Sequence, residues 1–211
     1  MKVLIATHNK GKEKEFLDMM STLFSDIELQ NYPRSFDVVE DQSTFRGNAK
    51  KKAREAVVEF GFITLADDSG LEVEALGNRP GIFSARFAGE NASDEENNSK
   101  LVKLLRSEKN RKARFVAEVV LAIPGNELEQ LNLSPSALLK GEEDNGVVFF
   151  YGRGECEGEI VDEPRGGDGF GYDPHFLIPE WNLTLAEVSR QKKATISHRA
   201  RALKRIKKQL E

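Results

Sequence analysis

The residues best suited to chemistry in this chain lie in four short polar segments. The first runs from Thr7 to Lys12 and follows an apolar stretch, Val3 to Ala6, that is typical of a buried strand. It offers a hydroxyl, an amide, two lysines and the backbone N–H groups at the start of an expected helix. Because helix N-termini favour negative charge, this turn is a candidate phosphate site. It lacks the Walker A spacing, and an ordinary polar turn is the alternative interpretation.

The second segment places two acids, Asp67 and Asp68, at the expected end of a strand. Adjacent side chains of an extended chain point to opposite faces, so we expect one of these carboxylates to face a given site. A carboxylate there can hold Mg²⁺ beside phosphate oxygens, or it can accept a proton from water. The alternative is an Asx-turn in which Gly70 adopts a positive φ.

Glycine dominates the third segment, Gly166 to Pro174, where four glycines alternate with polar residues and with Phe170 and Tyr172. A backbone without side chains lets a ligand approach closely, and an aromatic ring can stack on a nucleobase. The alternative is a flexible loop that the two aromatic residues anchor.

The fourth segment extends from Lys193 to Arg199 and begins an expected basic helix at Ser197-His198-Arg199. Cations near a helix N-terminus oppose the helix dipole, and an anionic ligand would relieve that cost. The alternative is a solvated surface cap.

Composition and charge limit the classes of function. The chain has 211 residues, with 31 Lys and Arg against 35 Asp and Glu, and a net charge of −4. A duplex-DNA binder is usually basic, so we expect no nucleic-acid partner. No apolar run approaches the roughly 20 residues of a membrane span, and the first apolar stretch is too short for a signal peptide. The single cysteine, Cys156, fits a reducing compartment, so we expect a cytoplasmic protein without a membrane partner.

The order of the expected elements predicts the fold class. Strands are expected at 3–6, 62–66, 71–75, 114–123 and 176–178, and a hairpin of strands at 147–151 and 155–161. Helices are expected after the first turn, after the caps Thr44 and Ser93, and after Ser197, while 125–146 is expected to be irregular. This mixed order favours an α/β fold with a mixed sheet flanked by helices, and residues 1–211 are expected to form a single domain with two lobes.

Together the segments resemble the inosine triphosphate pyrophosphatase family, which comprises non-standard purine NTP pyrophosphatases. Six family patterns occur in order along nearly the whole chain, which makes the resemblance specific. They are T-x-N-x-x-K at Thr7, Asn9 and Lys12, A-D-D-S-G-L at 66–71, P-G-[IV]-x-S-A-R at 80–86, G-F-G-Y-D-P at 169–174, A-E at 186–187 and K-x-x-I-S-H-R at 193–199.

The resemblance implies an elongated mixed sheet with helices, two lobes with an active cleft between them, dependence on Mg²⁺, and a homodimer. It also implies hydrolysis of ITP, dITP and XTP to the monophosphate and pyrophosphate. The alternative within this class is a pyrophosphatase of similar fold that acts on pyrimidine or other modified nucleotides. A rival from another class is an RNA-binding module, which the two acidic clusters and the acidic net charge disfavour.

Residue roles follow from the resemblance position by position. Asp68 would be the general base and a metal ligand, with Glu40 as the second metal carboxylate. Donors on His198 and Arg199 would read the 6-oxo group of the purine. The substrate would contact Thr7, His8, Asn9, Lys10, Gly11, Lys12, Ser69, Phe170, Gly171, Tyr172, Asp173, Lys193, His198 and Arg199.

The chain departs from the family pattern at three places. His8 stands where the family usually has Gly, which crowds the phosphate turn. Gly47 stands where the family usually has Glu, which removes one acid and leaves Glu40 as our choice of metal ligand. The stretch 125–146 is also longer than the usual connection.

Overall fold

The computed structural model describes residues 2–23, 28–30, 32–131 and 133–211. Its strands form one mixed sheet in the order β2-β1-β3-β5-β7-β8-β9, with β4 paired to β3 and β6 paired to β7. β1 is parallel to β2 and β3, whereas β3 and β4 are antiparallel, as are β7 and β8. The predicted mixed sheet with flanking helices is confirmed. No helix within the described ranges is both long and apolar enough to span a membrane.

The elements have the following bounds. The strands are β1 Lys2–Ala6, β2 Glu28–Gln30, β3 Ile63–Val73, β4 Arg79–Pro80, β5 Lys112–Pro124, β6 Glu142–Asp144, β7 Val147–Ile160, β8 Phe176–Ile178 and β9 Leu183–Thr184. The α-helices are α1 Lys10–Leu23, α2 Phe45–Phe60, α3 Asp94–Leu105, α4 Gly125–Leu128, α5 Pro135–Leu138, α6 Arg190–Ile196 and α7 His198–Leu210. Short 3₁₀ helices lie at 74–76, 81–86, 129–131, 173–175 and 185–187.

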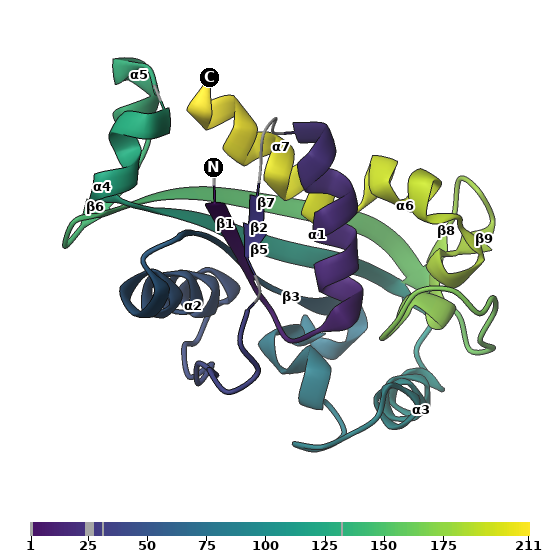
Figure 1. Ribbon diagram of the computed structural model, residues 1–211. Helices are drawn as coiled ribbons and strands as arrows, with labels where there is room; N and C mark the ends of the chain where they lie inside the picture. Colours follow the sequence, from purple (N-terminus) through teal and green to yellow (C-terminus); the bar gives the residue numbers. More distant parts are fainter. Residues whose placement is uncertain (1, 24–27, 31, 132) are drawn as a thin grey trace. The chain divides into compact units, whose positions relative to one another are not determined.

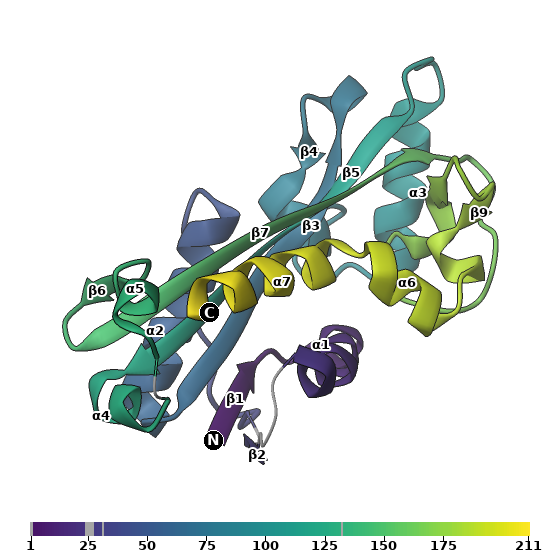
Figure 2. The same ribbon diagram turned by 90° about the horizontal axis from the view of Figure 1, so that it is seen from above.

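The chain divides into two compact units. The first unit comprises Met1–Asp68, Ala117–Gly154 and Arg199–Glu211, and the second comprises Ser69–Val116 and Glu155–His198. In the first unit, α7 covers one face of the sheet and α2 covers the other (Figures 1 and 2). Apolar side chains of the strands pack against α1 and α7 on one side and against the alanines of α2 on the other.

Strand β3 shows how alternation builds the two cores of the first unit. Ile63 and Leu65 belong to the cluster that packs against α1 and α7, whereas Ala66 belongs to the cluster that packs against α2. Side chains alternate along a strand, so Asp67 points to the same side as Ile63 and Leu65. Asp68 points to the same side as Ala66. The predicted caps are confirmed as well: Thr44 accepts a hydrogen bond from the N–H of Gly47 at the start of α2.

The second unit has a core of its own. It combines Leu101 and Leu105 of α3 with inward side chains of β3, β5, β7 and β8. Ser93 and Glu96 form the predicted capping box at the start of α3. The single cysteine, Cys156, is buried in this core.

Three expected boundaries are wrong, and glycines explain two of them. Asp67 and Asp68 lie inside one continuous strand, β3, and not at a strand end. The expected hairpin at 147–161 is likewise a single strand, β7. A Cβ on Gly152 would lie 2.1 Å from the Ala202 carbonyl oxygen of α7, so this glycine marks close helix packing and not a turn. The stretch 125–146 is not irregular, because it forms α4, a 3₁₀ turn, α5 and β6.

Candidate active site

The turn between β1 and α1 is organised by Asn9. The Asn9 side-chain oxygen accepts hydrogen bonds from the N–H groups of Gly11 (2.9 Å) and Lys12 (3.0 Å), so Asn9 caps α1. The hydroxyl of Thr7 in turn accepts from the N–H of Asn9 at 3.2 Å. Two of the backbone donors expected to meet phosphate are therefore already bonded to Asn9. The Lys10 side chain is exposed at this turn, whereas the Lys12 ammonium pairs with Asp67.

Asp67 lies among cations on the side of β3 that faces α1 and α7. Its Oδ2 is 3.2 Å from the Lys12 ammonium and 3.3 Å from the Arg199 Nε. Arg199 also donates to Glu15 of α1 at 2.7 Å. Burial lowers the pKa of Lys12, and the Asp67 carboxylate opposes that shift. Asp67 is therefore a buried counter-charge for Lys12, the last residue of the turn at 7–12.

Asp68 points the other way and meets α2. Its Oδ2 accepts a hydrogen bond of 2.9 Å from the Asn48 amide. Burial, together with the negative charge of Glu40, raises the pKa of Asp68 to about 6, although Lys12, Lys52 and the Asn48 bond oppose the rise. A carboxyl group that exchanges its proton near neutral pH is suited to general base chemistry. The two acids point to opposite faces of the strand, as expected.

Glu40 lies beside the buried side chain of Lys52, and the two form an ion pair. Burial lowers the pKa of Lys52, but the carboxylates of Glu40, Asp67 and Asp68 outweigh it and raise the pKa. Within the described ranges, no three His, Cys, Asp or Glu side chains gather closely enough to hold a metal ion. Mg²⁺ often uses one or two protein carboxylates and completes its shell with phosphate oxygens and water. The carboxylates of Glu40 and Asp68, which repel one another, match the one or two protein ligands that Mg²⁺ often uses.

Gly70 explains why β3 continues past the acids. A Cβ on Gly70 would lie 2.4 Å from both the Gly81 carbonyl oxygen and the Ser84 hydroxyl. The Ser84 hydroxyl accepts from the Leu71 N–H at 2.8 Å and donates to the Gly81 carbonyl at 2.6 Å. Gly70 is not among the positive-φ glycines, which rules out the Asx-turn alternative. The half-buried Ser69 therefore lies on a strand that is locked against the turn at Gly81.

In the second unit, Asp173 organises the glycine-rich segment. Its Oδ2 accepts from the Lys193 ammonium at 2.6 Å and from the Phe170 N–H at 3.1 Å. The Lys193 ammonium also lies 5.2 Å from the centre of the Phe170 ring. Gly169 has φ +84°, and a Cβ there would collide with the Asp173 carboxylate. Only glycine allows this backbone to wrap around Asp173.

The two aromatic residues of this segment differ in their surroundings. Tyr172 is buried, and its hydroxyl donates to the Ser84 carbonyl at 2.8 Å. Phe170 is half-buried. Tyr172 thus anchors the segment, and Phe170 is the better placed ring for stacking on a base. The backbone of Gly171 is held on both sides, because its N–H donates to Asp94 (2.7 Å) and its carbonyl accepts from Asn98 (2.9 Å).

His198 and Arg199 begin α7 but have different surroundings. The His198 ring is buried and stacks on Phe115, with centroids 5.1 Å apart and planes 12° from parallel. Two donors of Arg199 are bonded to Glu15 and Asp67. Arg199 thus forms ion pairs with two carboxylates, those of Glu15 and Asp67.

Sequence reasoning missed several residues of these two regions. Asn48 and Lys52 lie on one face of α2 at helical i, i+4 spacing, four residues apart, a pattern that could have been noticed. Glu15 and Asn98 had no local signal, because their partners lie 184 and 73 residues away along the chain.

The chain is similar to known proteins over nearly its whole length. A sequence model of the Ham1 family matches residues 3–209. The dITP/XTP pyrophosphatase of an Exiguobacterium species is 43% identical over 211 residues, with 100% of this chain and 97% of the relative covered. The dITP/XTP pyrophosphatase of Geobacter sulfurreducens is 41% identical, with 99% of this chain and 96% of the relative covered. The solved structure of the Staphylococcus aureus Ham1 protein is 36% identical, with a TM-score of 0.79 and coverage of 99% and 97%.

Proposed function

Because the chain belongs to the Ham1 family, we propose that it hydrolyses the non-standard purine nucleoside triphosphates dITP, ITP and XTP. The products are the nucleoside monophosphate and pyrophosphate. The names of the relatives do not favour the alternative of pyrimidine substrates. The observation that carries the mechanism is that two adjacent acids have different partners. Asp67 forms ion pairs with cations, whereas Asp68 accepts a hydrogen bond from an amide.

Asp68 acts as the general base in this proposal. Its carboxylate accepts a proton from a water molecule while the water oxygen bonds to the α-phosphorus. The bond from the α-phosphorus to the bridging oxygen breaks, and pyrophosphate leaves with that oxygen. The Asn48 amide donates to one carboxylate oxygen and so fixes the orientation of the group. Asp67 stays ionised between Lys12 and Arg199 and takes no proton in this step.

Positive charge balances the triphosphate in the first unit. Lys12, with the turn residues Thr7, His8, Asn9, Lys10 and Gly11, is proposed to bind the phosphates. Glu40 and Asp68 are proposed to hold Mg²⁺, which would neutralise charge on the phosphate oxygens when bound. Lys52 keeps Glu40 in place through their ion pair.

In the second unit, hydrogen bonds around the glycine-rich segment support the proposed substrate contacts. Phe170 is proposed to stack on the base, while Asp173 and Lys193 fix the backbone around that ring. Ser69, Gly171, Tyr172, His198 and Arg199 keep the substrate-binding roles that the family resemblance implies. Arg199 is proposed to position Asp67 as well, because it bonds to both Asp67 and Glu15.

A homodimer and a cytoplasmic location are also part of the proposal. Light scattering of the purified protein and fractionation of cells test these two points independently of the chemistry.

The decisive experiment measures pyrophosphate release from ITP, XTP, GTP and ATP, with Mg²⁺ and with excess EDTA. We expect rapid release from ITP and XTP, slow release from ATP and GTP, and no release under EDTA. Equal kcat/KM for ATP and ITP would refute the selectivity. Full activity in EDTA would refute the metal requirement.

A further inference from the structure

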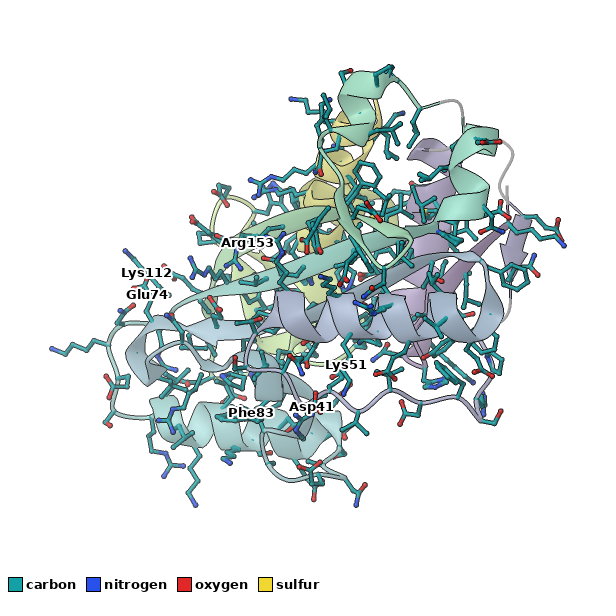
Figure 3. All side chains as sticks on the ribbon, turned by 90° about the vertical axis from the view of Figure 1, so that its left-hand side faces the viewer. Asp41, Lys51, Glu74, Phe83, Lys112 and Arg153 are labelled. Atoms are coloured by element: carbon teal, nitrogen blue, oxygen red, sulfur yellow. The ribbon has the colours of Figure 1, made fainter. Side chains whose placement is uncertain are left out.

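The stretch from residue 36 to 42 carries Glu40 and is tied to α2 through Lys51, Asn48 and Lys52, the last by its ion pair with Glu40. The Lys51 ammonium donates to the Val39 carbonyl at 2.9 Å and bonds to the Asp41 carboxylate, and Figure 3 shows Lys51 beside Asp41. The Asn48 side-chain oxygen accepts from the Gln42 N–H at 2.9 Å. All three ties come from the helix that also positions Asp68. None of them involves the turn at 7–12.

A tie from outside α2 comes from His8, in the middle of the phosphate turn. Its Nε2 lies 2.8 Å from the Phe36 carbonyl oxygen, and its ring packs on Tyr32 with centroids 4.6 Å apart. Tyr32, Phe36 and Phe60 continue this row of rings to the end of α2. Within residues 2–23 and 32–131, no other side chain of the turn bonds to the stretch 36–42.

The partner in this contact determines which nitrogen of the His8 imidazole carries the hydrogen. A carbonyl oxygen only accepts, so Nε2 must carry the hydrogen in the neutral ring as well as in the charged ring. The link therefore forms with the neutral ring and with the charged ring alike. Glycine, which the family pattern has at this position, has no side chain to make such a contact.

We propose that His8 is a positioning residue that ties the triphosphate-binding turn to the stretch carrying Glu40. Asn9 fixes the turn to α1, so His8 projects from a rigid base. The tie sets the separation between the groups that hold the phosphates and the carboxylate of Glu40. This inference rests on the proposed function, since it assigns the turn to triphosphate and Glu40 to the metal.

Two substitutions separate the hydrogen bond from the ring contact. His8→Gln keeps an N–H donor at similar reach, and His8→Phe keeps a ring against Tyr32 but loses the donor. A lost hydrogen bond of this kind corresponds to roughly a two- to tenfold change in an equilibrium. We expect His8→Phe to raise KM for ITP by about that factor with kcat changed less, and His8→Gln to stay within about twofold of the wild type.

A measurement without metal or turnover complements the kinetics. Inorganic triphosphate in EDTA should raise the thermal midpoint of the wild type and of His8→Gln more than that of His8→Phe. Lys51→Met is the matched control, because it loosens the same stretch from the α2 side and leaves the turn untouched. It should retain the wild-type response to metal-free triphosphate.

The outcomes are distinguishable. A KM and a triphosphate response that are the same in both His8 variants, whether normal or impaired, would overturn the hydrogen-bonded tie. If the wild type releases no pyrophosphate from ITP, the proposed function fails. The metal-free comparison of wild type, His8→Gln and His8→Phe then still decides whether the tie orders the turn.

Discussion

The acidic pair of β3 and the glycine-rich segment hold their functional groups by different means. Around Asp67 and Asp68, buried side chains of opposite charge hold one another, and burial shifts pKa values. Around Phe170, the backbone itself is held by Asp94, Asn98 and Asp173. The first region should therefore be sensitive to substitutions that remove a charge but keep the shape of the side chain. The second should be sensitive to substitutions that change the shape but not the charge.

Neutralising the proposed base should have the largest effect. Asp68→Asn keeps the size of the side chain but removes the proton acceptor, and general base catalysis contributes about 10²–10⁴-fold. We expect kcat for ITP to fall by about that factor, with the far-ultraviolet circular dichroism spectrum unchanged. Steady-state kinetics on the purified variant measure the effect. A kcat near that of the wild type would remove Asp68 from the mechanism.

The neighbouring acid should respond mainly in stability. Asp67→Asn leaves Lys12 and Arg199 facing a neutral amide in a buried setting, and breaking a buried ion pair costs about 3–5 kcal/mol. We expect urea unfolding to show a loss near the lower end, about 3 kcal/mol, because Arg199 keeps Glu15. The loss in kcat should be smaller than for Asp68→Asn. An unchanged unfolding free energy would mean that Asp67 is not the counter-charge of these cations.

The smallest effect is expected from changing the proposed stacking ring. Phe170→Leu keeps an apolar side chain but removes the aromatic face, and a stacked base is worth about 1–3 kcal/mol. We expect KM for ITP to rise by roughly 5- to 150-fold, with kcat and the unfolding midpoint nearly unchanged. Phe83→Leu, at the exposed ring labelled in Figure 3, is the matched control in the same unit. Equal KM values for the two variants would show that Phe170 does not stack on the base.

Two of the three errors in the predicted boundaries share one physical cause. Gly70 and Gly152 look like turn residues in sequence, yet each lies inside a strand where another segment approaches too closely for a Cβ. In the sequence, a glycine that permits a turn looks the same as a glycine that permits close packing. What distinguishes them is the atom opposite, which belongs to a segment remote in sequence.

The sequence by itself determined the mixed α/β class, the caps at Thr44 and Ser93, and the alternation that sends Asp67 and Asp68 to opposite faces. These features depend on neighbours within a few residues, so local spacing encodes them. Only the tertiary structure decided which partners those acids meet. Arg199 is 132 residues from Asp67 and 184 from Glu15, and Asn48 is 20 residues from Asp68. Such pairings depend on how helices pack on the sheet, and no local pattern specifies the distance between two charges that packing brings together.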